Sequence, residues 1–383
     1  MNLPIYLDYN ATTPVDPRVA EAVTLVLREQ FGNPSSDHVY GIHARETVAW
    51  SRQQVAELLE AEAAEIVFTG SASEANNLAI LGVAGTSAPR RKHLIVSSVE
   101  HPSVRAPAEA LRARGWEVTF LPVDETGRVG IESLVGAIRE ETALISVMHA
   151  NNEVGTIQPI AEISAVARAH GLPLHVDASQ SVGKIPVSVQ ELGADLLTLA
   201  GHKFYAPKGI GVLYVRRGVE LAPLLHGAFQ EGGRRTGTEN VAFIAGLGKA
   251  ARLARQRLAM EESRLRYKRD TLHRILLDAI PELQLNGHPR KRLPNTLHVS
   301  FPEVAGRELL AHAAGEVAAS VGSACHAHDD RPSGVLAAMG LSAERAAGAV
   351  RLSVGVPTTE AEIERAARAL FEAWQVVRRR KAG

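Results

Sequence analysis

Two charged side chains of this 383-residue sequence stand where an apolar run ends, a place where charge is costly unless it has a partner. Lys203 follows the run 196–199, and a partly desolvated lysine amine loses basicity and can form a Schiff base. Asp177 closes the run 174–176, and a protonated ring nitrogen is one partner for such a carboxylate. Each residue also has an ordinary interpretation, Lys203 as a solvated loop lysine and Asp177 as the N-cap of a helix.

Small and hydroxylated residues follow another apolar run in a pattern that favours a phosphate site. Residues 69–74 come after the run 66–68 and open a helix that contains Leu78. Backbone N–H groups and the dipole at a helix N-terminus bind phosphate, although Ser73 could equally be a plain N-cap. Residues 237–240, which follow two arginines, are a second candidate with both charge and hydroxyl.

A histidine and an arginine extend this set. His101 follows the run 94–96, where an imidazole can stack on a cofactor ring and move protons, or be an ordinary loop histidine. Arg351 lies inside the apolar run 350–354, so its guanidinium needs a partner. A substrate carboxylate bound by two hydrogen bonds and a structural salt bridge are both open.

The single cysteine, Cys325, lies among small and polar residues, which favours a flexible, partly exposed loop. Its thiol, next to His326 and close to His328, could be a thiolate nucleophile, with an inert buried cysteine as the alternative. Asp329 and Asp330 would complete a metal cluster, but these ligands crowd into six residues, tighter than metal sites usually are, and no metal site is predicted. A mobile thiol, together with a Schiff-base lysine, a phosphate-binding site and a carboxylate-binding arginine, suits an amino-acid lyase that transfers an atom of its substrate to a cysteine.

Short apolar runs that alternate with helical segments must position these side chains. Continuous apolar strands between helices predict an α/β fold with a mostly parallel sheet, which binds ligands beyond the carboxyl ends of its strands. A charged helical stretch at 241–277 indicates a long connecting helix, followed by the shorter runs of a smaller α+β domain. We expect a large cofactor-binding domain at 16–255 and a small domain made of 1–15 and 256–383, which carries the Cys325 loop. The predicted strands of the large domain are 66–68, 94–96, 144–148, 174–176, 196–199 and 212–215.

Composition and charge narrow the class of protein. Lys+Arg and Asp+Glu both number 42, so the net charge is zero, which disfavours a nucleic-acid-binding protein that works by bulk charge. One cysteine excludes an intramolecular disulfide framework. The N-terminus lacks a basic region followed by an apolar core, and no apolar run reaches the roughly 18 residues of a membrane span, so we expect a cytoplasmic protein with no membrane partner.

Several segments match a known family in order and in kind. They are Tyr6–Pro14, Phe31–Ser36, Ser73–Asn77, Asn151–Gly155, His175–Asp177, Gly201–Tyr205, Gly237–Asn240 and Gly322–Cys325. With this set the chain resembles, over essentially its whole length, the cysteine desulfurases of the NifS/IscS type in the class V aminotransferase family. The stretch around Cys325 and His326 is also similar to selenocysteine lyase.

The resemblance implies a pyridoxal 5′-phosphate (PLP) enzyme of fold-type I that works as a homodimer. Lys203 would bind the cofactor covalently, His101 would stack on its ring and transfer protons, and Cys325 would attack the substrate sulfur. The implied reaction converts L-cysteine to L-alanine and leaves the sulfur on Cys325 as a persulfide for an acceptor protein. The other implied roles are Asp177 at the ring nitrogen, Gln180 at the phenolic oxygen, Ala72, Ser73 and His202 at the phosphate, Thr238 at the phosphate from the partner subunit, Asn152 at the cofactor, and Asn152 with Arg351 at the substrate carboxylate.

One position departs from the family in a way that bears on cofactor binding. Ala200 stands where many members have a phosphate-binding serine, a lack that selenocysteine lyases share. Because selenocysteine lyase has a nearly identical scaffold, L-selenocysteine is an alternative substrate, with selenide and alanine as products. A related PLP-dependent C–S lyase, and a scaffold that binds PLP or a partner without catalysis, are two further interpretations of the same residues. The sequence leaves open the choice between sulfur and selenium, the identity of the acceptor and any role of His326 and His328.

Overall fold

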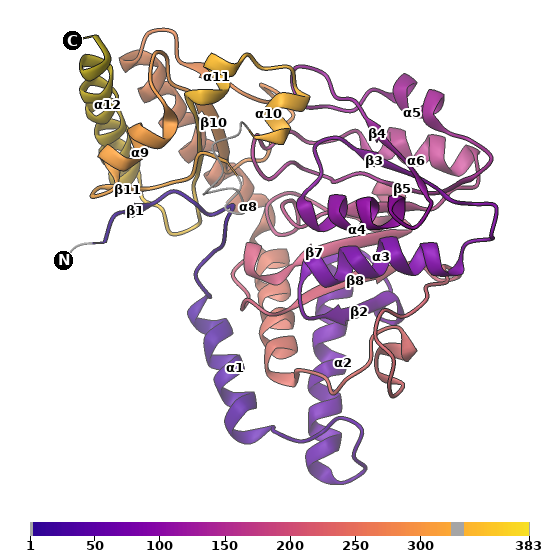
Figure 1. The fold of residues 1–383 in the computed structure, drawn as a ribbon. Helices are drawn as coiled ribbons and strands as arrows, with labels where there is room; N and C mark the ends of the chain where they lie inside the picture. The colour runs from indigo at the N-terminus through magenta and orange to yellow at the C-terminus, as the bar shows by residue number, and fades with distance from the viewer. Residues whose placement is uncertain (1–2, 323–332, 383) are drawn as a thin grey trace.

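A seven-stranded sheet lies at the centre of the larger part of the chain in the computed structural model, which describes residues 3–322 and 333–382 (Figure 1). The strand order is β2-β8-β7-β6-β5-β3-β4, with β8 antiparallel to both of its neighbours and the other pairs parallel. The predicted α/β class with a mostly parallel sheet is confirmed. The strands are β2 (Ile66–Thr69), β3 (His93–Ser97), β4 (Glu117–Leu121), β5 (Thr142–Ser146), β6 (Leu174–Asp177), β7 (Leu196–Ala200) and β8 (Gly211–Val215).

Burial explains which of these strands can be recognised in the sequence. Every residue of β2, β3, β5, β6, β7 and β8 is buried, so these strands contain continuous apolar runs, except β6, where His175 separates Leu174 from Val176. β4 lies at the edge of the sheet, and Leu121 alone of its five residues is buried, so it was not predicted. β5 begins at Thr142 rather than at 144, and the end of the predicted run, Val147 and Met148, continues past the strand toward the site described below.

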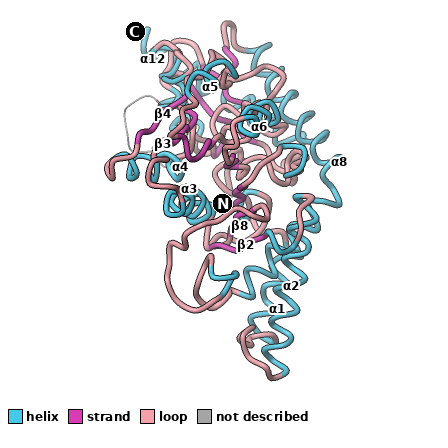
Figure 2. The backbone as a smooth tube through the Cα atoms, turned by 90° about the vertical axis from the view of Figure 1, so that its right-hand side faces the viewer, coloured by secondary structure: helices cyan, strands magenta, loops and turns pink. Residues whose placement is uncertain are grey.

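Helices cover both faces of the sheet. α3 (Ala72–Thr86) and α4 (Pro102–Arg112) pack over one face, and α2 (Val39–Leu59) and α6 (Ile160–Ala169) over the other. Figure 2 shows α1 (Pro17–Glu29) and α2 running beside the long helix α8 (Val241–Ala279), which confirms the predicted helical stretch. The shorter helices here are α5 (Ile131–Ala137) and α7 (Val189–Leu192). Within residues 3–322 and 333–382, no helix is both long and apolar enough to cross a membrane.

Helix α8 joins the two parts of the chain. Its first half packs into the core of the large sheet through Ile244 and Leu247, and its second half packs into a separate core through Leu272 and Leu276. Our proposed domain boundary at residue 255 lies between these halves, inside one continuous helix.

A three-stranded antiparallel sheet with the order β12-β10-β9 supports the second core. The first strand of the chain, β1 (Ile5–Tyr6), pairs in parallel with β11 (Val317–Ala318), so the N-terminal segment starts beside the C-terminal part and then runs toward the large sheet. The other elements are β9 (Gln284–Leu285), β10 (Thr296–Ser300), α9 (Gly306–Ala313), α10 (Gly334–Ala338), α11 (Ala343–Ala347), β12 (Ala349–Ser353) and α12 (Glu360–Ala382).

Candidate active site

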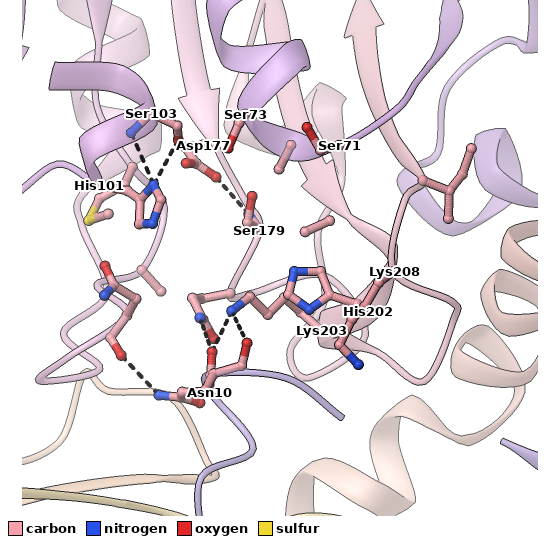
Figure 3. A pocket seen from close by; sticks show the side chains of 18 of the residues that line it. Asn10, Ser71, Ser73, His101, Ser103, Asp177, Ser179, His202, Lys203 and Lys208 are labelled. Carbon is pink, nitrogen blue, oxygen red and sulfur yellow. Dashed lines mark hydrogen bonds between the residues drawn. The ribbon is translucent and has the colours of Figure 1, made fainter. Parts of the chain in front are cut away.

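A cavity of about 370 Å³ lies where the chain leaves the carboxyl ends of β3, β5, β6 and β7. This is the edge at which a parallel sheet binds its ligands. Lys203, Asp177 and His101 line the cavity together (Figure 3), and Arg351 reaches it from β12. The other predicted residues that line it are Ala72, Ser73, Asn152, Gln180 and His202.

The N-terminus of α3 forms one end of the cavity. Ser71 is the N-cap, and its Oγ accepts a hydrogen bond of 3.1 Å from the N–H of Glu74, so the N-cap interpretation of Ser73 is wrong. Ala72 and Ser73 lie in the first turn, whose N–H groups have no helical acceptor and favour an anion. β8 passes close behind this turn, since a Cβ on Gly211 would lie 2.6 Å from the carbonyl carbon of Ser71.

The side chain of Glu74 holds the segment before α3 in place. Its carboxylate accepts hydrogen bonds from the N–H of Gly70 at 2.7 Å and from Nε of Arg235 at 2.8 Å. Arg235 precedes the segment 237–240, our second phosphate candidate. Thr238 in that segment is exposed and does not line the cavity of its own chain.

A chain of hydrogen bonds leads from Asp177 toward His101. Oδ2 of Asp177 accepts a bond of 2.9 Å from Nδ2 of Asn76, which also donates to Oγ of Ser103 at 2.8 Å. Oδ1 of Asp177 accepts a bond of 2.9 Å from the N–H of Ser179. Turns rather than a helix follow Asp177, so its interpretation as a helix N-cap is wrong.

His101 caps helix α4 and lines the cavity at the same time. Its Nδ1 accepts a hydrogen bond of 3.1 Å from the N–H of Ser103 and lies 2.8 Å from the Oγ of that residue. Because Nδ1 is an acceptor, the proton of the neutral imidazole is on Nε2. The ring is therefore held in one tautomer by the start of its own helix.

Lys203 enters the cavity from the short 3₁₀ helix η2 (Gly201–Lys203), directly after β7. Its Nζ donates to the backbone carbonyls of Asn10 and Ala11 at 2.6 and 2.7 Å, so the interpretation as a solvated loop lysine is wrong. Nε2 of Gln180 donates to the same Asn10 carbonyl at 2.9 Å. The N-terminal segment thus forms the wall that faces the amine, as Figure 3 shows for Asn10.

His202 is held neutral beside Lys203. Burial, and then the positive charges of Lys203, Lys208 and Lys184, lower the pKa of His202 to about 4. Its Nδ1 lies 3.1 Å from Oγ1 of Thr12. When the Thr12 hydroxyl donates to Nδ1, the proton of the neutral His202 is on Nε2, which can then donate a hydrogen bond.

Arg351 is 1% exposed and has one of the two partners we considered, the structural salt bridge. Its Nη2 donates to Oδ1 of Asp8 at 2.7 Å, which is the structural salt bridge, and its Nη1 donates to the carbonyl of Asn152 at 3.0 Å. Its Nε is buried and has no hydrogen-bond partner among the described residues. The guanidinium is therefore fixed in direction and still has a donor for a carboxylate.

Sequence reasoning missed Asn10 and Asn76, which are 1% and 0% exposed and connect the groups named above. Both lie in segments that carried the family resemblance, and a buried asparagine needs several hydrogen-bond partners. Cys325 lies outside the described residues, as do His326 and His328.

Comparison with known proteins gives one consistent answer. The family model for aminotransferase class V matches residues 5–366. A cysteine desulfurase, IscS, of Dictyoglomus turgidum is 45% identical over 364 residues, which is 95% of this chain and 92% of that protein. Another, IscS 1 of Archaeoglobus fulgidus, is 46% identical over 361 residues, or 94% of each chain.

Solved structures agree with these relatives. A NifS-like protein superposes with a TM-score of 0.92 at 36% identity, covering 98% of this chain and 100% of its own. SspA in complex with cysteine superposes with a TM-score of 0.81 at 37% identity, covering 91% of this chain and 98% of its own.

Proposed function

The chain belongs to the class V aminotransferase family and groups there with the cysteine desulfurases, and on this premise we propose that it converts L-cysteine to L-alanine with PLP and passes the sulfur to Cys325 as a persulfide. One observation carries the proposal. The Lys203 amine and the Asp177 carboxylate line one cavity, which the N-terminus of α3 and the buried Arg351 also line.

The residues of the cavity fit PLP. The α3 N-terminus and His202 would hold the phosphate, Lys203 the aldehyde carbon, and the 5%-exposed carboxylate of Asp177 the ring nitrogen. Two polar atoms in cavity-lining residues, Oγ of Ser179 and Nε of Arg351, are buried without a partner among the described residues, as expected of a site that takes a polar ligand. When bound, PLP supplies an aldehyde that joins amines and a ring that accepts electrons.

The chain's own side chains would manage the protons. Asp177, kept in place by Asn76 and the N–H of Ser179, would keep a proton on the ring nitrogen. Nε2 of His101 carries a proton in the tautomer set by Ser103, so the imidazole can donate one at the substrate and later recover it. Once displaced from the aldehyde carbon, the Lys203 amine would accept the proton from Cα of the substrate.

Arg351 and Asn152 would select an amino acid by its carboxylate. The guanidinium is already aligned by Asp8 and by the Asn152 carbonyl, so little freedom is lost when a carboxylate binds. Asn152 is 9% exposed and lines the same cavity, beside the place where that carboxylate would lie.

The sulfur step is tested directly by Cys325→Ser. The variant is expected to bind PLP like the wild type, to carry no added sulfur atom at position 325, and to lose about 10²-fold in alanine formation, with the remaining activity supplied by thiols in solution. The measurement is alanine release from L-cysteine and from L-selenocysteine, paired with mass spectrometry of the residue-325 peptide. Near-normal turnover of L-cysteine by the variant contradicts the role of Cys325. If the substitution lowers turnover of L-cysteine but leaves selenide release from L-selenocysteine unchanged, the result would favour selenocysteine lyase instead.

A phosphate-contact prediction concerns Ala200, which is 2% exposed and lines the cavity. Ala200→Ser adds a hydroxyl at the position where family members have one, and a new hydrogen bond of about 1 kcal/mol should tighten PLP binding about fivefold. Titration of the apoprotein with PLP, followed by its visible absorbance, gives the dissociation constant. Unchanged or weaker binding would place the phosphate elsewhere than beside the carboxyl end of β7.

We also propose a homodimer and a protein acceptor for the sulfur. Thr238 lies outside the cavity of its own chain, which is consistent with a role in the partner's cavity. Large apolar side chains are exposed between α1 and α2 and shortly before Thr238, among them Phe31 at 70% and Phe229 at 83%. Exposed aromatic residues of this kind are typical of an interface.

A further inference from the structure

Besides Lys203 and Lys208, a third lysine, Lys184, lies close to the cavity without lining it. Lys184 is 6% exposed, and its Nζ donates to Oε1 of Gln180 at 2.7 Å and to Oδ1 of Asn10 at 3.3 Å. The charged groups that act on it are Lys203 on η2 and Arg351 on β12, both cations. Burial, followed by these two charges, holds the pKa of Lys184 well below its ordinary value. A lysine is thus a costly choice for packing at this position, since an apolar side chain of similar length would avoid the cost.

The turn that carries Lys184 is built to bring it there. Gly183 has φ +77°, and a Cβ on it would lie 2.6 Å from Cβ of Phe204, the residue after Lys203. Only glycine allows both the backbone conformation and this close approach. The turn after β6 therefore lies directly against the chain that carries Lys203.

The contact with Gln180 has a definite consequence. The two ends of a carboxamide have nearly the same shape, so packing alone does not decide which end faces a ligand. Nζ of Lys184 donates to this carboxamide, and a donor must meet its oxygen, so the end of Gln180 at Lys184 is Oε1. Nε2 then faces the other way, where it shares the Asn10 carbonyl with Nζ of Lys203 and lines the cavity.

We propose that Lys184 is a positioning residue that fixes the carboxamide of Gln180 with its N–H₂ group toward the cavity, where it would donate to the phenolic oxygen of the cofactor. The inference rests on the proposed function, because it takes PLP to be the ligand. Lys184 touches no reacting atom and acts through Gln180.

The test is a double-mutant cycle between Lys184→Met and Gln180→Leu, read in the bound cofactor rather than in turnover. Without Lys184, Oε1 of Gln180 loses its donor, and the carboxamide is held only by its hydrogen bond to the Asn10 carbonyl. A less firmly held N–H₂ group stabilises the anionic phenolic oxygen less, so the chromophore should keep its proton to a pH about one unit higher. The midpoint of a pH titration of the visible absorbance measures this, and PLP binding should weaken about fivefold.

In the Gln180→Leu background, Lys184→Met should move the midpoint by less than about a third of a unit. Lys184→Gln, which keeps an N–H donor, should give a midpoint between those of the wild type and Lys184→Met, and it serves if the methionine variant fails to fold. Lys249→Met on α8 is the matched control and should leave the midpoint unchanged.

The outcomes are separable. An unchanged midpoint in Lys184→Met, or a shift of equal size with and without Gln180, overturns the positioning role, as does a change confined to the melting temperature of the apoprotein. A wild-type chain that binds PLP but releases no alanine overturns the proposed function and leaves this cycle readable. A wild-type chain that binds no PLP overturns both.

Discussion

Lys203→Ala is expected to lower alanine formation from L-cysteine by about 10⁵-fold, because the same amine would hold the cofactor and take the proton from the substrate Cα. The substitution should leave the fold intact. Nζ of Lys203 donates to two carbonyls, and that of Asn10 keeps its second donor, Nε2 of Gln180. The carbonyl of Ala11 borders the cavity, where water can replace the lysine.

Absorbance and turnover together decide this prediction. The purified variant should lack the visible band of the lysine-bound cofactor, keep the melting temperature of the apoprotein within a few degrees, and still bind PLP weakly through the α3 end of the cavity. Lys249→Ala, on α8 and away from the cavity, should keep both the band and the activity. Turnover by Lys203→Ala within about tenfold of the wild type would remove the foundation of the proposed mechanism.

Three of the residues that could be found from the sequence share one property: each stands at or after the end of a strand whose residues are all buried. Asp177 is the last residue of β6, and Lys203 and His101 come after β7 and β3, so the buried run marks the strand and the polar residue at or after its end marks the binding edge. β4 could not be predicted, because its exposed position at the edge of the sheet allows Glu117 and Thr119 to interrupt the apolar run.

The residues that could not be found depend on contacts between distant parts of the chain. The Asn10 carbonyl meets Lys203 across 193 positions, because β1 starts beside β11 and the chain then crosses to the large sheet. The spacing of residues along a short stretch of sequence cannot predict such a contact. The two interpretations of Arg351 could not be separated for the same reason, since its partner Asp8 lies 343 positions away and the arginine is both salt-bridged and part of the cavity wall.

Asp177→Asn is expected to lower kcat by about 10³-fold with a much smaller change in KM, because an amide cannot keep a proton on the ring nitrogen that would accept the electrons of the breaking bond. The local structure makes this substitution mild for the fold. Asn76 and the N–H of Ser179 each donate to one carboxylate oxygen, and asparagine retains one of the two acceptors. We expect a loss of about 1–3 kcal/mol in the free energy of unfolding from the donor that is left without an acceptor.

Asp195→Asn separates that stability cost from the loss of chemistry. Asp195 also accepts from a backbone N–H, that of Leu174 at 2.9 Å, and pairs with Arg216 at 3.2 Å. It precedes β7, however, whereas Asp177 ends β6, so the two carboxylates stand at opposite ends of neighbouring parallel strands. Both variants should unfold at lower denaturant concentration, but only Asp177→Asn should lose kcat. If the Asp195 variant loses kcat to the same extent, the effect of Asp177 is one of stability, and the cavity would need another partner for the ring nitrogen.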